Sequence, residues 1–83
     1  MKVRNQKYLS EFGENLKALI ASTEKSPEYV AANGNIETKQ VYRAINGEHS
    51  ISLSTILALA KGLGIHPKKL LDFEFDFDYE ISE

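Results

Sequence analysis

The stretch that most constrains this chain is residues 27–46, because it reads as two short helices separated by a sharp polar turn. Ser26 is suited to cap the first helix, and Pro27 suits its first position, where a missing backbone N–H costs nothing. Residues 33–35, Asn-Gly-Asn, tolerate positive φ or bond their own backbone, so they are expected to end this helix and turn the chain steeply. Any fold of this chain must therefore contain a tight pair of helices.

The second helix of the pair has an apolar side and a polar side. Val41 and Ala44 or Ile45 recur at helical spacing with Ile36 ahead of them, and Ala31 in the first helix is small enough for a close crossing. Two helices joined in this way form a helix-turn-helix, whose second helix enters the DNA major groove. The polar side can reach base edges with Thr38, Lys39, Gln40, Tyr42 and Arg43.

Continued through residues 47–71, this segment resembles the Cro/C1-type (XRE-like) helix-turn-helix family, and the resemblance covers roughly residues 12–71. Its most specific parts are the run VAA…NI…V..A, Gly47 after the second helix, and the helix SLSTILALAKGLGI at the family's usual distance. The resemblance implies an all-α fold, a compact five-helix lambda-repressor-like DNA-binding domain. It also implies that double-stranded DNA is the partner.

Three positions depart from the family's pattern. The usual Gln at the start of the first motif helix is Pro27, which removes a phosphate-binding amide side chain. The usual turn Gly is Asn35, which can still adopt αL, and the usual Ser before the recognition helix is Glu37, which brings a negative charge near the DNA backbone. We therefore expect weaker or differently anchored DNA binding than in typical members.

Length and composition exclude several classes of protein. A chain of 83 residues forms one small domain with little room for a large ligand cavity. It has no Cys, which excludes a disulfide framework and a Cys-based zinc site. No apolar run is long enough for a membrane span, and the N-terminus lacks a secretory signal, so we expect a cytoplasmic protein.

The residues give little support for catalysis or a cofactor. His49 and His66 are not spaced as a metal pair, and the carboxylates at the C-terminal end lack the Gly turn of a calcium loop. His49 is more readily a surface residue or phosphate donor, and His66 beside Pro67 more readily caps a helix. We expect no enzyme activity, no metal and no cofactor.

The charge is divided between the two parts of the chain. Residues 72–83 carry six of the twelve acidic residues and none of the ten basic ones, so residues 1–71 carry a net charge of +4 although the whole chain carries −2. A basic body suits a nucleic-acid partner. The first seven residues hold Lys2, Arg4 and Lys7, either as a solvated terminus or as an arm that contacts DNA.

Outside the motif, two more helices and a short final one are expected. A scaffold helix over residues 8–23 presents an apolar stripe, and Ser52 caps the most apolar helix, which Gly62 and Gly64 end. A short helix then runs from Pro67 through Leu71. The expected stripe of the scaffold helix is Leu9, Phe12, Leu16, Leu19 and Ile20, and that of the apolar helix is Leu53, Ile56, Leu57, Ala60 and Leu63.

The stretch after Leu71 changes from helical spacing to strict alternation, which is typical of a strand. Its aromatic content favours a strand over a disordered acidic tail, and a lone strand needs a partner edge. The simplest partner is a second copy, so we expect a homodimer, with residues 1–71 as the DNA-binding domain and residues 72–83 for dimerisation. The side chains expected on the pairing face are Phe73, Phe75, Phe77, Tyr79 and Ile81.

DNA roles follow for the matching positions. In the first turn of the recognition helix, around residues 38–46, Lys39 suits guanine, Gln40 suits adenine, and the Thr38 methyl suits thymine. Tyr42 and Arg43 lie one turn further on; a merely solvated face is the alternative for all five. The resemblance implies backbone contacts by Lys25, Ser26, Asn46, His49 and Ser50. A two-fold dimer would read a palindromic operator with half-sites roughly 34 Å apart. A repressor that occupies a promoter is the expected role, and activation by contact with polymerase is the alternative.

Two other interpretations stay open. The first is a protein-interaction or antitoxin-like module whose C-terminal strand binds a partner protein such as a toxin, with DNA contact secondary or absent; Pro27 and Glu37 favour it mildly. The second is an acidic tail that folds over the basic head and inhibits it, since opposite charges on one chain attract at low salt.

Overall fold

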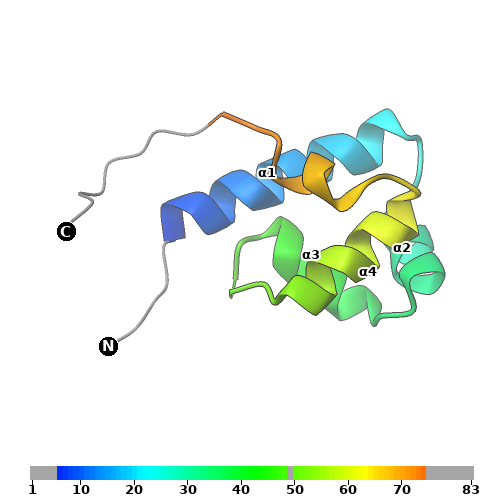
Figure 1. The fold of residues 1–83 in the computed structure, drawn as a ribbon. Coiled ribbons are helices and arrows are strands. Elements are labelled where there is room, and N and C mark those ends of the chain that lie inside the picture. Colours follow the sequence, from blue (N-terminus) through cyan, green and yellow to red (C-terminus); the bar gives the residue numbers. More distant parts are fainter. Residues whose placement is uncertain (1–5, 49, 75–83) are drawn as a thin grey trace.

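The structure is a computed structural model, and it describes residues 6–48 and 50–74. In these residues it is all-α, with no strand. The elements are α1 (Gln6–Ser22), α2 (Pro27–Gly34), α3 (Thr38–Ile45), α4 (Leu53–Leu63) and the 3-10 helix η1 (Pro67–Leu71). Figure 1 shows α1 along one side of the molecule, α2, α3 and α4 packed on the other, and the short η1 beside α1 and α4.

The boundaries of α2 confirm the predicted signals. The Ser26 hydroxyl accepts a hydrogen bond from the Tyr29 amide at 3.1 Å, and Pro27 occupies the first turn. Asn35 adopts the left-handed conformation at φ 62° and ψ 44° and closes the helix. The helix runs on through Gly34, however, so Asn35 alone makes the turn that was expected of residues 33–35.

The ends of α4 agree with the sequence at Ser52 and Gly64 but not at Gly62. Ser52 accepts a hydrogen bond from the Thr55 amide at 3.1 Å, and Gly64 takes φ 73°. Gly62, expected to end the helix, lies buried inside it. A Cβ at this position would collide with the backbone carbonyl of Val30, so the glycine is there to let α2 approach α4.

The predicted fifth helix is only a 3-10 helix. Five residues beginning with Pro67 close i to i+3 hydrogen bonds, such as Lys69 N–H to the His66 carbonyl at 3.0 Å, and are too few to propagate an α-helix. The predicted strand is not supported where it can be examined, because residues 72–74 are in no strand. The rest of that prediction, residues 75–83, lies outside the described residues.

The core is centred where α1, α2, α3 and α4 meet. Its fully buried large side chains are Leu16, Leu59, Leu70, Val30 and Val41. The α1 stripe is confirmed, with Phe12, Leu16 and Ile20 buried and Leu9 and Leu19 half-buried.

The predicted stripe of α4 is partly wrong. Leu53 is 71% exposed and Leu57 is 48% exposed, whereas Leu59, which lies outside the expected stripe, is fully buried. Because α2 approaches α4 on the side of Gly62, the buried face of α4 is rotated toward Leu59 and Leu63. Leu53 and Leu57 are left on the surface.

Two amide side chains tie helix ends together. Asn33 donates from Nδ2 to the carbonyls of Lys61 and Gly62 at 3.2 and 3.3 Å, which satisfies the last turn of α4 from α2. Asn15 donates to the carbonyls of Lys69 and Leu70, both at 3.1 Å, and so fixes η1 on α1.

Within the part of the chain that the structure describes, no helix is both long and apolar enough to cross a membrane.

Candidate nucleic-acid interface

The helix predicted to enter DNA, α3, is held firmly by its inner face. Val41 and Ala44 are both 0% exposed. On the side of α1, a Cβ at Gly13 would collide with the carbonyl of Ile45 and lie 2.8 Å from that of Ala44. The two helix backbones are therefore in direct contact, which leaves α3 little freedom to shift.

The outward side of α3 is basic. Lys39 and Arg43 are its only charged residues, and their spacing of four places them on one line of the helix. At about 100° per residue, that line lies roughly opposite the buried Val41. On that line Lys39 is exposed and Arg43 is half-buried, while Thr38 and Gln40 are half-buried on the flanks.

Tyr42 is engaged with α2. Its hydroxyl donates to Oε2 of Glu28 at 2.8 Å. This hydrogen bond is the main cause that raises the pKa of Tyr42 above its usual value; desolvation and the negative charge of Glu28 act in the same direction. The side chain is 43% exposed, so its ring remains accessible although its hydroxyl is occupied. Sequence spacing gave no sign of this bond, because its partners are fourteen residues apart.

The residues expected to contact the DNA backbone are not all equally available. The Ser26 hydroxyl caps α2, and the Lys25 amine lies 5.2 Å from the centre of the Tyr29 ring. Asn46 and Ser50 are exposed, and the Asn46 amide donates to Glu48 at 3.4 Å. His49 lies outside the described residues.

Of the residues expected to mediate dimerisation, only Phe73 is described. It is half-buried and packs against the domain's own core. The core is thus contacted from beyond Leu71, the expected end of the DNA-binding domain. The remaining members of the set, Phe75, Phe77, Tyr79 and Ile81, lie outside the described residues.

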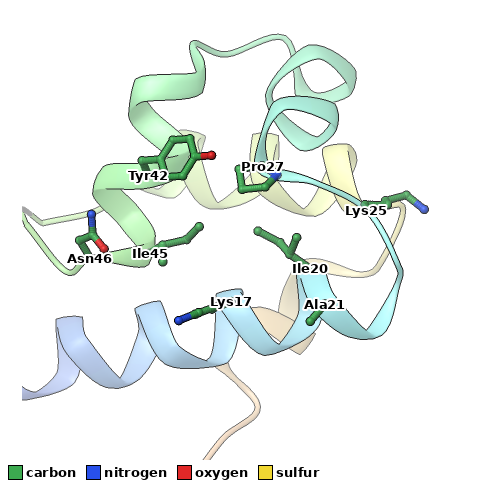
Figure 2. Close-up of a pocket in the computed structure, with 8 residues that line it drawn as sticks. All are labelled: Lys17, Ile20, Ala21, Lys25, Pro27, Tyr42, Ile45 and Asn46. Atoms are coloured by element: carbon green, nitrogen blue, oxygen red, sulfur yellow. The ribbon is translucent and has the colours of Figure 1, made fainter.

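A pocket of about 420 Å³ opens beside α3, and the sequence analysis did not predict it. Figure 2 shows side chains from α1, α3 and the start of α2 converging on it. Lys17 extends from α1 toward the end of α3 where Ile45 and Asn46 lie, whereas Lys25 points away. The lining residues are Lys17, Ile20, Ala21, Lys25, Pro27, Tyr42, Ile45 and Asn46.

The described residues include no group of three or more His, Asp or Glu side chains that could hold a metal ion. What the site offers instead is a rigid helix with two cations on its outer line and polar groups on its flanks. Such a surface can bind phosphates through charge and bases through hydrogen bonds.

Comparison with known proteins agrees with this geometry. A family model described as the Cro/C1-type HTH DNA-binding domain matches residues 15–76. Among solved structures, the chain is similar to the restriction-modification controller protein C.AhdI from Aeromonas hydrophila, with 31% identity and a TM-score of 0.73 over 77% of this chain and 97% of that one. No curated protein matches the sequence.

Proposed function

Because the chain belongs to the family of Cro/C1-type helix-turn-helix DNA-binding domains, we propose that it represses transcription by binding a palindromic operator as a homodimer. In this proposal α3 lies in the major groove of each half-site. The similarity to a restriction-modification controller protein supports a role in controlling transcription.

One observation carries the proposal. The helix α3 buries Val41 and Ala44 completely and has no acidic residue, while its two cations, Lys39 and Arg43, line its outer side. A helix that is clamped on one side and basic on the other can present fixed donors to base edges. The rigid contact at Gly13 sets the angle at which those donors are presented.

Roles within the site follow from the positions of the side chains. Lys39 and Arg43 are proposed to donate to guanine or phosphate, and Thr38 and Gln40 to contact bases from the flanks of α3. Tyr42 is proposed to contact DNA with its ring, since its hydroxyl is held by Glu28. Asn46 and Ser50, both exposed, are proposed as contacts to the DNA backbone.

The DNA part of the proposal is tested by selecting bound sequences from random duplexes with the full chain. Lys39→Ala and Arg43→Ala should each weaken binding to the selected duplex by about 1–3 kcal/mol and relax the preference at one base position. Lys68→Ala also removes one positive charge, but from η1, which lies away from α3, so it should have little effect on DNA binding. Failure to enrich any sequence would refute sequence-specific binding.

The dimer is tested by the solution mass of the full chain and of a chain ending at Glu74, which keeps Phe73 on the core. A dimer that becomes a monomer on truncation supports pairing through the C-terminal residues. Two monomers would exclude that pairing and favour the antitoxin-like module, whose tail binds another protein.

Repression is tested by placing the selected sequence over a promoter in a reporter strain. Expression of the chain should lower transcription of the reporter, because the bound protein occupies the promoter. A rise in transcription would show activation instead.

A further inference from the structure

The pocket beside α3 is formed by two helical faces with the same spacing. Lys17, Ile20 and Ala21 come from α1, at positions i, i+3 and i+4. Tyr42 and Ile45 of α3 and its C-cap residue Asn46 follow the same pattern. Pro27 closes one end (Figure 2). These faces meet because Gly13 of α1 lies against the backbone carbonyls of Ala44 and Ile45 in α3, which brings the two helices close together.

The chemistry of the pocket favours a ligand that combines an anionic group with a small apolar moiety. Its apolar lining includes Ile20, which is 5% exposed, together with Ile45 and the ring of Pro27. None of its lining residues is acidic, and Lys17 is the cation that extends along it. The Tyr42 ring is a fixed wall, because its hydroxyl is bonded to Glu28.

The position of the pocket indicates which anion that is. A helix with its side chains is about 10–12 Å across and nearly fills the major groove, which is about 12 Å wide, so the groove's phosphates run along both flanks of an inserted helix. Tyr42 and Asn46 lie on one flank of α3, next to the outer line of Lys39 and Arg43. The pocket opens on that flank.

We infer that this pocket receives one phosphate and its deoxyribose from the DNA backbone, with Lys17 as the phosphate-binding cation. The sugar packs on Ile20, Pro27 and Ile45, and the phosphate lies at the Lys17 amine. Asn46 borders the phosphate without holding it, because its amide donates to Glu48 at 3.4 Å. This inference rests on the proposed function and deepens it, since it makes the scaffold helix α1 part of the DNA interface. Pro27, which has no N–H to offer a phosphate, then contributes apolar surface.

The first test compares Lys17→Gln with Lys68→Gln in the full chain. Both changes remove one positive charge from an exposed side chain, one in the pocket and the other in η1. Affinity for a random-sequence duplex is measured over a series of salt concentrations. Lys17→Gln should reduce the slope of log affinity against log salt by about 0.9, the amount for one lost phosphate contact, and Lys68→Gln should leave it unchanged.

The second test locates the phosphate. In the duplex selected by the full chain, phosphates are replaced one at a time by neutral methylphosphonates. At one position, the methylphosphonate should weaken DNA binding by the unmodified protein but not by Lys17→Gln. The reason is that the methylphosphonate and the substitution each remove the same contact, the one between Lys17 and that phosphate. Thermal unfolding of the variant should match that of the unmodified chain, since Lys17 is exposed.

The inference is overturned if Lys17→Gln has the same salt slope as the unmodified chain, or if Lys68→Gln loses as much. It is also overturned if inorganic phosphate, at equal ionic strength, shifts the NMR signals of Lys17 and Asn46 as the duplex does, because the pocket would then bind a free anion. Failure of the unmodified chain to bind any duplex would instead refute the proposed function itself.

Discussion

Gly13→Ala tests the contact between the scaffold helix and α3. In an exposed helix interior this change would stabilise the protein by about 1 kcal/mol, since Ala is the better helix former. At Gly13, however, the new methyl group would collide with the Ile45 carbonyl and lie 2.8 Å from the Ala44 carbonyl. Backbone atoms cannot rotate away as side chains do, so α1 and α3 must move apart.

The size of the effect follows from these two opposing terms. Overpacking costs about 1–3 kcal/mol, and a collision with backbone belongs at the upper end of that range. Subtracting the helix-propensity gain leaves a net destabilisation of about 2 kcal/mol. For a domain of this size, that lowers the melting temperature by roughly 8–16 °C.

The assay is thermal unfolding followed by circular dichroism, with Ala18→Gly as the matched control. Ala18 is exposed in the same helix, so this reverse exchange should cost about 1 kcal/mol from propensity alone. The protein with glycine is thus expected to be more stable than the protein with alanine at position 13 and less stable at position 18. A higher melting temperature for Gly13→Ala would refute the close approach of the helices and, with it, the fixed angle of α3.

Three further outcomes are expected. Asn33→Ala should cost about 1–2 kcal/mol in denaturant unfolding, because the last carbonyls of α4 lose their donor; Asn33→Asp, which keeps the size but not the Nδ2 donors, should not restore stability. Leu59→Ala should lower the free energy of unfolding by about 2–5 kcal/mol, and Leu53→Ala by less than about 0.5 kcal/mol, because Leu59 is buried and Leu53 is exposed. Equal losses would show that α4 is oriented as its sequence suggested. Glu28→Gln should lower the raised pKa of Tyr42 toward its usual value, as measured by an ultraviolet titration from which the signal of Tyr42→Phe is used to isolate Tyr42. Because the pKa of Tyr42 is raised in the folded state, the hydrogen bond stabilises the fold fully below about pH 10, and this stabilisation is lost as the pH rises through the folded-state pKa. An unchanged pKa in Glu28→Gln would contradict the hydrogen bond.

The sequence determined the local features of the protein. Helix caps act within three residues of their own position, which is why the Ser26 and Ser52 caps could be assigned without a fold. The left-handed Asn35 and Gly64 were placed only among the residues expected to end α2 and α4. Helical periodicity likewise predicted that Val41, with Ala44 or Ile45, faces the core and that the opposite side of α3 is polar. The family pattern rests on the same short-range signals.

Only the tertiary structure decided how the helices face one another. Gly62 has the sequence signature of a helix end, yet it lies inside α4 because the carbonyl of Val30 approaches there. That approach rotates α4, buries Leu59 and leaves Leu53 exposed. Whether a side chain meets a neighbour depends on residues far away in the chain, so no local pattern could reveal it.

The same reason explains which part of the proposed DNA interface the sequence missed. Lys17 reads as one more polar position on a scaffold helix, and Tyr42 reads as a free side chain on a recognition helix. The pocket and the bond to Glu28 exist only because α1, α2 and α3 converge at one place. A surface built from three helices is a property of their packing, which the sequence specifies only through the folded chain as a whole.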